Sequence, residues 1–457
     1  MKKLAALVIL ILRFYVDSCT SDSAHPGYPQ SSGFCGLQSD ELIVDSFRLQ
    51  QQIDELASFS DSSAPSVTRI LYSEADVRAR RYIKDLMDSS GLIVREDGVG
   101  NIFGRWEGSD SMAPAIATGS HTDAIPFSGK YDGVVGVLGA IEAINALNRT
   151  GFKPRRSLEV IMFTSEEPTR FGISCLGSRL LAGLPNMKSS LERVVDKDNI
   201  SFPDAAAIAG YEFALETLLE VPLKEDTYAA FVELHIEQGP ILEEEGIAIG
   251  IVTAIAAPAS LKVDFRGDGG HAGAVLMPSR NDAGLAAAEL ALAVEKHVLE
   301  TQSADTVGTT GVLELYPGAV NSIPSAAHIE IDIRDIDEQR RNSVIQHIKV
   351  SASEIATRRH VHLDFQIVTQ DPPAASSQKI VKAIESASQQ LGLTSKHMIS
   401  RAYHDSLFMA RVSPMGMIFI PCYRGYSHRP DEFASREDLS NGIKVLALSL
   451  LALSSDL

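Results

Sequence analysis

Several histidine and carboxylate side chains in this sequence stand where apolar segments end, a placement that suits metal binding. They are His121 and Asp123 in SHTD, Asp132 in SGKYDG, Glu166 and Glu167 in TSEEP, His235 in LHIEQG and His428 in YSHRPDE. Any one of them alone would pass for an ordinary polar loop residue. Together, imidazole and carboxylate ligands suit divalent ions of borderline character, such as zinc, manganese or cobalt.

This set of side chains is large enough to hold two ions and to activate water between them. One carboxylate would bridge the pair, and two ions about 3.5–4 Å apart lower the pKa of a shared water towards neutrality. In the adjacent pair Glu166 and Glu167, one glutamate can ligate while its neighbour stays free as a general base. Asp123, two residues after His121, can hold the far nitrogen of that imidazole. The pattern predicts metal-assisted hydrolysis.

The segments that carry these residues are typical of buried strands in a mostly parallel sheet. PAIATGSHTD, LEVIMFTSEEP, AAFVELHIEQG and MGMIFIPCY are short apolar runs that end in polar residues. A helix is predicted over 133–147, where Val134, Val137 and Leu138 share one stripe. Ligands of open α/β sheets collect outside the carboxyl ends of the strands. We therefore predict an α/β catalytic domain with its site at that edge.

A change of pattern near residue 250 indicates an inserted second domain. Segments such as SLKVDFRGDGGHAGA and VHLDFQIV alternate polar and apolar residues, as half-exposed antiparallel strands do. Two helices are expected with them, over about 281–300 and 337–358. We predict an α+β insert, a lid or dimerisation domain, over 250–368. It splits the catalytic domain into 40–249 and 369–457.

The bulk properties describe a large, acidic globular protein. A length of 457 residues favours two or three domains, and the net charge of −18 excludes nucleic-acid binding, which needs a basic surface. An acidic field repels anions, so a carboxylate substrate would need a local cationic clamp. The four cysteines have neither a disulfide-framework spacing nor a zinc spacing.

The N-terminus differs from the rest. In MKKLAALVILILRF, two lysines precede an apolar stretch too short to span a bilayer, which predicts a secretory signal peptide over residues 1–22; a short leader is the alternative. No other run is long enough to span a membrane. The sequons at Asn148 and Asn199 predict a glycoprotein if the chain is secreted.

From about residue 65 to the C-terminus, the sequence resembles a family of dinuclear-metal amidohydrolases related to aminoacylases and dipeptidases. The resemblance rests on GSHTDA…YDGVVGVLGAIEA…FTSEEPTRFG…LHIEQG…GGHAGA…NSIP…DIRD…SHRPDE. Within that family it resembles the branch of N-carbamoyl-L-amino acid, allantoate and ureidoglycolate amidohydrolases. The strings SEEPTRFG and LHIEQG are far more specific than a single HxD.

This resemblance implies a role for each matching residue. It implies metal ligation by His121, Glu167, His235 and His428, with Asp132 bridging and Glu166 as the general base. It also implies that His271 reaches the partner subunit's site in a homodimer and stabilises the oxyanion. Substrate would be bound by Gln238, Asn321, Arg334, Tyr403 and His404. Arg334 would supply the cationic clamp through two parallel hydrogen bonds.

The string RAYHDSLFMA bears on the substrate. Tyr403 narrows the expected pocket and adds a hydroxyl, which fits a small hydroxylated acid better than a bulkier diureido compound. AYHDSLFMA and SGKYDGVVGVLG most resemble the ureidoglycolate amidohydrolases of plant purine breakdown. That resemblance implies hydrolysis of (S)-ureidoglycolate to glyoxylate, ammonia and carbon dioxide, two Mn²⁺ ions, and residence in the endoplasmic reticulum.

Three other functions stay open at this point. Allantoate amidohydrolase would share the fold and mechanism, and an N-carbamoyl-L-amino acid hydrolase would need an apolar side-chain pocket. A non-catalytic metal-binding protein is disfavoured because every expected ligand and Glu166 are present.

Overall fold

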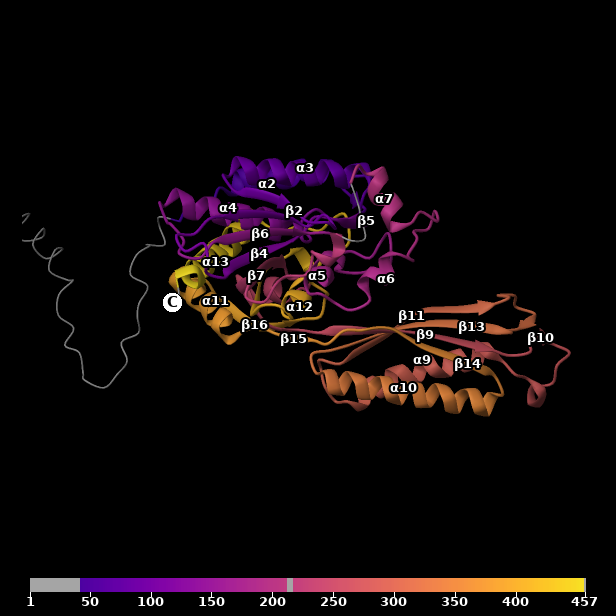
Figure 1. The fold of residues 1–457 in the computed structure, drawn as a ribbon. Helices are drawn as coiled ribbons and strands as arrows, with labels where there is room; N and C mark the ends of the chain where they lie inside the picture. Colours follow the sequence, from indigo (N-terminus) through magenta and orange to yellow (C-terminus); the bar gives the residue numbers. More distant parts are fainter. Residues whose placement is uncertain (1–41, 212–216, 456–457) are drawn as a thin grey trace, which may run out of the picture. The chain divides into compact units, whose positions relative to one another are not determined.

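The computed structural model describes residues 42–211 and 217–455, so the predicted signal peptide, Cys19 and Cys35 lie outside the described residues. A nine-stranded sheet dominates one part of this region (Figure 1). Its order is β15-β8-β17-β7-β4-β6-β3-β2, and β16 pairs with β8. The bounds of these strands are β2 Ile93–Glu96, β3 Ile102–Trp106, β4 Ala115–His121, β6 Leu158–Phe163, β7 Tyr228–Ile236, β8 Ile249–Ile255, β15 Ala374–Ala375, β16 Ser395–Ser400 and β17 Met415–Ile420.

This sheet is mixed, so the prediction of a mostly parallel sheet was correct only for its centre. The four central strands β17, β7, β4 and β6 pair in parallel, as do β16 and β8. The pairings of β17 with β8, β8 with β15, β6 with β3 and β3 with β2 are antiparallel. The carboxyl ends of the four central strands therefore meet at one edge, where the site was expected.

Helices cover the sheet because successive strand residues point to opposite faces. The predicted helix after Asp132 is α4 (Val134–Arg149), which packs with α13 and is buried along most of its length. Gly136 lets α4 approach closely, since an added Cβ would lie 2.5 Å from the Leu234 carbonyl oxygen. The other helices of this part are α2 Ser46–Ser58, α3 Glu74–Ser89, α5 Leu176–Leu181, α6 Met187–Leu191, α7 Phe202–Ile208, α8 Ile241–Glu245, α11 Gln378–Gln390, α12 Ser406–Met409 and α13 Arg436–Ser455.

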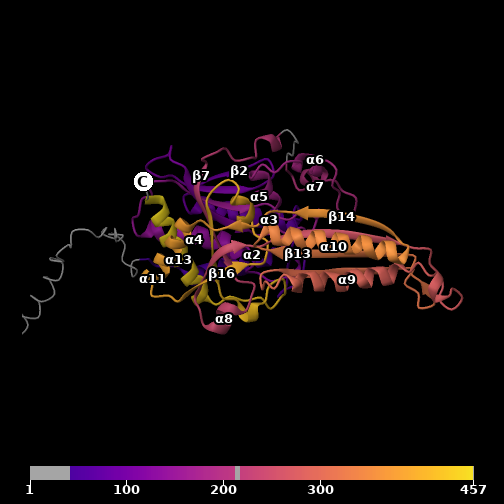
Figure 2. The same ribbon diagram turned by 90° about the horizontal axis from the view of Figure 1, so that it is seen from below.

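The region after residue 256 forms a second sheet of four antiparallel strands in the order β11-β13-β9-β14. Along β13 every second residue is buried, and α9 and α10 pack together over this sheet, as both views show (Figures 1 and 2). The observed helices match the predicted ones to within a few residues. The elements are β9 Ala257–Arg266, β11 Val307–Tyr316, β13 Ala326–Asp335, β14 His362–Gln370, α9 Ala283–Glu300 and α10 Glu338–Arg359.

Two small sheets complete the fold: β1 (Val67–Arg69) pairs with β5 (Ala124–Ser128), and β10 (Gly270–His271) pairs with β12 (Ser322–Ile323). Among the described residues, Cys175 and Cys422 are free and buried. Within residues 42–211 and 217–455, no helix combines the length and the apolar character that a membrane crossing requires.

Candidate active site

The parallel centre of the sheet brings the predicted ligands to one place. His121 is the last residue of β4, and His235 lies at the end of β7. Glu166 and Glu167 follow β6 in the next loop, and His428 lies in the loop after β17. Because these strands are parallel neighbours, their loops leave the sheet at the same edge.

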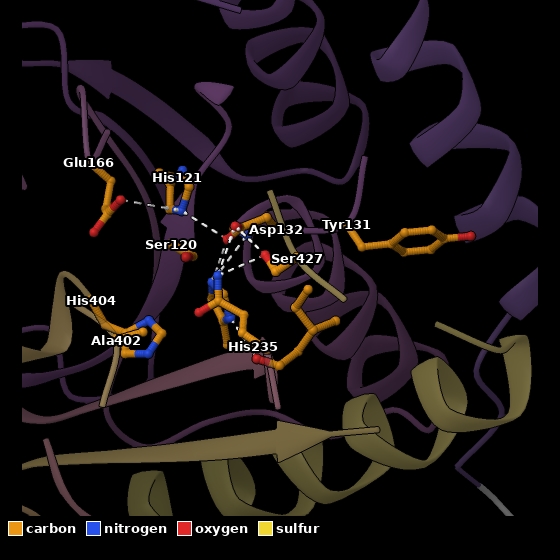
Figure 3. Close-up of polar contacts among 12 residues, drawn as sticks. Ser120, His121, Tyr131, Asp132, Glu166, His235, Ala402, His404 and Ser427 are labelled. Atoms are coloured by element: carbon orange, nitrogen blue, oxygen red, sulfur yellow. Dashed lines mark hydrogen bonds and ion pairs between the residues drawn. The ribbon is translucent and has the colours of Figure 1, made fainter. Parts of the chain in front are cut away.

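The carboxylate of Asp132 lies at the centre of this group (Figure 3). Its Oδ1 is 3.1 Å from Nε2 of His235 and 3.6 Å from Nε2 of His121. Its Oδ2 is 3.0 Å from Nε2 of His428, and that nitrogen is 3.2 Å from Glu167 Oε1. The ligand atoms therefore form two groups that share Asp132, one with His121 and His235, the other with Glu167 and His428. This is the arrangement expected for a bridging carboxylate.

The hydrogen bonds of His121 and His235 turn Nε2 of both rings towards Asp132. Nδ1 of His121 lies 3.0 Å from the Asp123 carbonyl oxygen, and Nδ1 of His235 lies 2.8 Å from the Ile236 carbonyl oxygen. A carbonyl only accepts, so both Nδ1 atoms carry hydrogen and a neutral ring presents a lone pair at Nε2. The Gly133 N–H also donates to Nε2 of His235 at 3.2 Å. Nε2 and the carboxylate oxygen of Asp132 therefore face each other favourably with either a proton or a metal ion between them.

The charges of the site agree with that conclusion. Burial alone would raise the pKa of Asp132, but hydrogen bonds with His121, His235 and His428 outweigh it and hold this pKa well below its usual value. The hydrogen bonds of His428 to Asp132 and Glu167 raise its pKa to about 11. The pocket thus stabilises positive charge close to Asp132, so the donor set fits divalent ions.

The two adjacent glutamates turn to different partners. Glu167 faces His428, whereas Oε2 of Glu166 faces Nε2 of His121 at 3.9 Å. The other oxygen of Glu166 accepts a hydrogen bond from the Cys175 thiol at 3.1 Å. Asp123 accepts the backbone N–H groups of both glutamates, at 3.2 and 2.9 Å, and so holds their loop. Burial raises the pKa of Glu166 well above its usual value, which suits a group that must both take and give a proton.

The backbone at the site takes conformations that few residues tolerate. Gln238 and His428 have left-handed φ values of 56° and 60°. Gly133 combines φ 65° with ψ −41°, outside the left-handed basin open to other residues. An added Cβ at Gly133 would lie 2.4 Å from the His121 ring. The sequence Asp-Gly before α4 therefore allows the imidazole of His121 to lie against the helix start.

A cavity of about 240 Å³ opens beside these residues. Gln238, Arg334 and Tyr403, three of the predicted substrate-binding residues, line it together with the ligand set. The Gln238 amide donates to Asp132 Oδ2 at 2.8 Å, and the Tyr403 hydroxyl donates to Asp371 at 2.9 Å. Arg334 lies on the cavity wall but donates to Asp332 at 2.7 Å and to the Arg401 carbonyl.

Three of the residues predicted for catalysis or substrate binding do not line this cavity. His404 is buried behind His235, with ring centroids 4.6 Å apart, and its Nε2 lies 2.8 Å from the Ser400 hydroxyl. His271 and Asn321 lie together at the β10–β12 pair, where the Ala272 N–H donates to the Asn321 carbonyl. His271 is exposed there.

Sequence reasoning missed several residues that hold the ligands. Ser427 and Glu432 contact Asp132, and Cys175 contacts Glu166. Ser427 and Glu432 stand in the string YSHRPDE, so a carboxylate four residues beyond a ligand histidine was an available signal. Nothing local marks Cys175, because its partner is set by the fold.

The chain is similar to known proteins over most of its length. The family model described as peptidase family M20/M25/M40 matches residues 117–452. The ureidoglycolate hydrolase of Oryza sativa subsp. japonica is 69% identical over 91% of this chain and 86% of its own length. The ureidoglycolate hydrolase of Arabidopsis thaliana is 67% identical over 94% of this chain and 90% of its own length.

Solved structures agree. AtUAH in complex with (S)-hydroxyglycine aligns with a TM-score of 0.84 and 67% identity, over 92% of this chain and 100% of that chain. AtUAH in complex with glyoxylate aligns equally well. The family match covers well over half of the chain, and its range contains the whole ligand set. This chain therefore belongs to peptidase family M20/M25/M40.

Proposed function

We propose that this protein hydrolyses (S)-ureidoglycolate to glyoxylate, ammonia and carbon dioxide with two divalent ions, of which Mn²⁺ is the preferred one. The substrate assignment is supported by identities of 67–69% to two plant ureidoglycolate hydrolases over nearly the whole chain. It is also supported by the ligands of AtUAH, (S)-hydroxyglycine and glyoxylate.

These two ligands fit one reaction sequence. Water adds to the ureido carbonyl, and the C–N bond to the substituted nitrogen breaks. Carbamic acid and hydroxyglycine are released. Carbamic acid decomposes to carbon dioxide and ammonia, and hydroxyglycine loses a second ammonia to give glyoxylate. One water and one ureidoglycolate therefore give one glyoxylate, one carbon dioxide and two ammonia molecules.

The residues of the site divide this work. His121 and His235 would hold one ion with Asp132, and Glu167 and His428 would hold the other. The bound ions would supply a water of lowered pKa. Glu166 takes the proton of the attacking water at Oε2 and delivers it to the departing nitrogen. Arg334 binds the substrate carboxylate once it exchanges its contact with Asp332, and Gln238 orients the amide.

The division between Glu166 and Glu167 is the observation that carries this chemistry. Glu167 faces His428, while Glu166 lines the cavity with one oxygen towards His121 and the other held by Cys175. A glutamate held in this way can move protons without acting as a ligand.

Replacement of Glu166 tests this assignment. Glu166→Gln should abolish ammonia release from ureidoglycolate while the protein still binds two Mn²⁺ ions per chain. Glu167→Gln, the matched variant one residue away, should weaken ion binding in addition to lowering activity. Turnover by Glu166→Gln at the wild-type rate would contradict the base assignment.

Allantoate is the rival substrate, and it is bulkier than ureidoglycolate, so the space in the cavity distinguishes the two. Tyr403 lines the cavity, and its hydroxyl is tied to Asp371. Removing this ring should admit a bulkier ureide. Tyr403→Ala should therefore lower kcat/KM for ureidoglycolate and raise the ratio of allantoate to ureidoglycolate turnover. The assay is ammonia release from both substrates, and from an N-carbamoyl-L-amino acid, after chelation and refilling with single metals.

We further propose that the chain works as a homodimer through the region that carries α9. Leu285, Leu292 and Leu299 repeat every seven residues along α9 and are 43%, 68% and 69% exposed. Such a stripe suits a partner helix. His271 would then act in the site of the partner subunit. Co-expressed His271→Ala and Glu166→Gln chains should regain activity that neither variant has alone. Continued inactivity of the mixed protein would contradict action in trans.

For the cellular location we propose the endoplasmic reticulum, on the basis of the leader pattern over residues 1–22. The sequon residues Asn148 and Asn199 are both exposed, so glycans could be attached there. A fluorescent fusion and digestion with a glycosidase test these two points.

A further inference from the structure

A buried carboxylate outside the ligand set holds the bridging aspartate by both its main chain and its side chain. Oε1 of Glu432 accepts the N–H of Tyr131 at 2.7 Å and the N–H of Asp132 at 3.0 Å. Oε2 of Glu432 lies 3.1 Å from the hydroxyl of Ser427. That hydroxyl lies 2.9 Å from Oδ2 of Asp132. Glu432 itself is only 4% exposed.

The loop that carries Asp132 is shaped around this carboxylate. An added Cβ at Gly129 would lie 2.3 Å from Cβ of Glu432 and 2.5 Å from its Oε1. Only a glycine leaves room for Glu432 at that point. Tyr131 packs edge-on against Phe433, the next residue after Glu432, with ring centroids 5.9 Å apart. Two segments some three hundred residues apart are therefore fitted to each other at Asp132.

Ser427 links this support to the ligand atoms. Its hydroxyl also accepts a hydrogen bond from the Gln238 amide at 3.0 Å. Its single hydrogen can be donated to either of the two carboxylates beside it, Asp132 or Glu432. Oδ2 of Asp132 thus accepts the Gln238 amide and lies beside the Ser427 hydroxyl, while Oδ1 faces His121 and His235. The two oxygens of Asp132 are kept in different directions, which a bridge between two ions requires.

We propose that Glu432, acting through the backbone of residues 131–132 and through Ser427, is the positioning residue that lets Asp132 bridge two divalent ions. The inference rests on the two-ion centre proposed above. Among the described residues, Asp132 is the only one shared by the two ligand groups. Displacement of Asp132 should therefore weaken the binding of both ions together. Loss of the His428 side chain, in contrast, should weaken the binding of only one ion.

Ion binding measures this directly and needs no substrate. Protein stripped by a chelator is titrated with Mn²⁺ by calorimetry, and the bound metal is counted by mass spectrometry. Glu432→Ala should weaken both ions by about 10- to 100-fold, the range typical for residues that orient metal ligands. Glu432→Gln keeps an oxygen for the two N–H groups and should retain most of the affinity. Ser427→Ala should cause a smaller loss, again at both ions.

Two controls make the outcome decisive. Asp431→Asn changes the neighbouring carboxylate, which is exposed and paired with Arg429, and should leave both affinities unchanged. His428→Ala should weaken one ion only. If Glu432→Ala fails to fold, Ser427→Ala carries the test, and wild-type affinities for both ions in that variant overturn the proposal. The proposal would be overturned if Ser427→Ala and Glu432→Ala both bound the two ions with wild-type affinity. It would also be overturned if the loss of affinity were confined to one ion. A wild-type protein that binds no ion pair would instead overturn the two-ion centre.

Discussion

Gly133→Ala is a small change that should disable the site, because it adds one methyl group where the structure has no room. Gly133 lies between Asp132 and α4, with φ 65° and ψ −41°. The new Cβ would lie 2.4 Å from Cδ2 and Nε2 of the His121 ring. Nε2 is the atom that faces Asp132. The methyl group and the predicted ion therefore compete for the same side of the imidazole.

Two effects set the magnitude. An L-residue in the left-handed region costs about 1–2 kcal/mol, and this ψ is less favourable still. In addition, ordinary contact begins near 3.4 Å, so the ring or the loop must move by about 1 Å. A displacement of about 1 Å in a catalytic group costs on the order of 100-fold in rate. We expect kcat/KM to fall about 100-fold and the ion proposed at His121 and His235 to bind more weakly.

Gly246→Ala is the matched control. Gly246 has the same φ of 65°, and an added Cβ there meets nothing within 4 Å. It should lower the unfolding midpoint through backbone strain but leave kcat/KM and Mn²⁺ affinity near wild type. The assay compares ammonia release at saturating Mn²⁺, Mn²⁺ titration and thermal unfolding for the three proteins. Equal activities for the two glycine variants would refute the argument from space around His121.

Three further outcomes follow from the contacts described. Cys175→Ala should lower kcat with little change in KM, while Cys175→Ser, which keeps a donor to Glu166, should retain more activity; the opposite order would make the thiol a packing residue only. In protein stripped of ions the pKa of His428 is about 11, so this imidazole is protonated at neutral pH and must lose its proton to bind metal. Mn²⁺ affinity should therefore rise with pH, and titration in buffers of different ionisation enthalpy should show proton release; heats that do not depend on the buffer would contradict this. Asp76→Ala should destabilise the fold by about 3 kcal/mol because it removes the carboxylate 2.9 Å from the buried guanidinium of Arg80 and leaves only Glu96, at 4.0 Å. Asp431→Ala at the exposed pair should cost at most about 1 kcal/mol, and denaturant unfolding compares the two variants.

The ligand positions were predictable because each strand end is marked locally. An apolar run followed by a polar residue places His121 and Glu166 at the edge of the sheet without knowledge of the pairing. The direction of the outer strands was not predictable in the same way. A short apolar run such as that of β3 or β8 carries no sign of whether its neighbour runs parallel, since this depends on distant partners.

The supporting residues escaped prediction for a related reason. Glu432 acts on a group 300 residues away in the sequence, so its string YSHRPDE does not reveal its partner. Cys175 lies nine residues from Glu166, but the loop between them gives no sign that the two side chains meet. The resemblance placed both Tyr403 and His404 at the substrate, yet the two side chains differ: Tyr403 lines the cavity and His404 is buried behind His235. Adjacent positions in sequence do not share an environment.

Strand β17 comes from the last tenth of the chain but lies between β7 and β8. During synthesis, both of these strands emerge from the ribosome long before the strand that joins them. A nascent or truncated chain ending before Met415 would expose two unpaired strand edges, a recognised hazard for aggregation. Such a chain would also lack His428 and Glu432. The ligand group of Asp132, Glu167 and His428 is therefore complete only when the last tenth of the chain has been made.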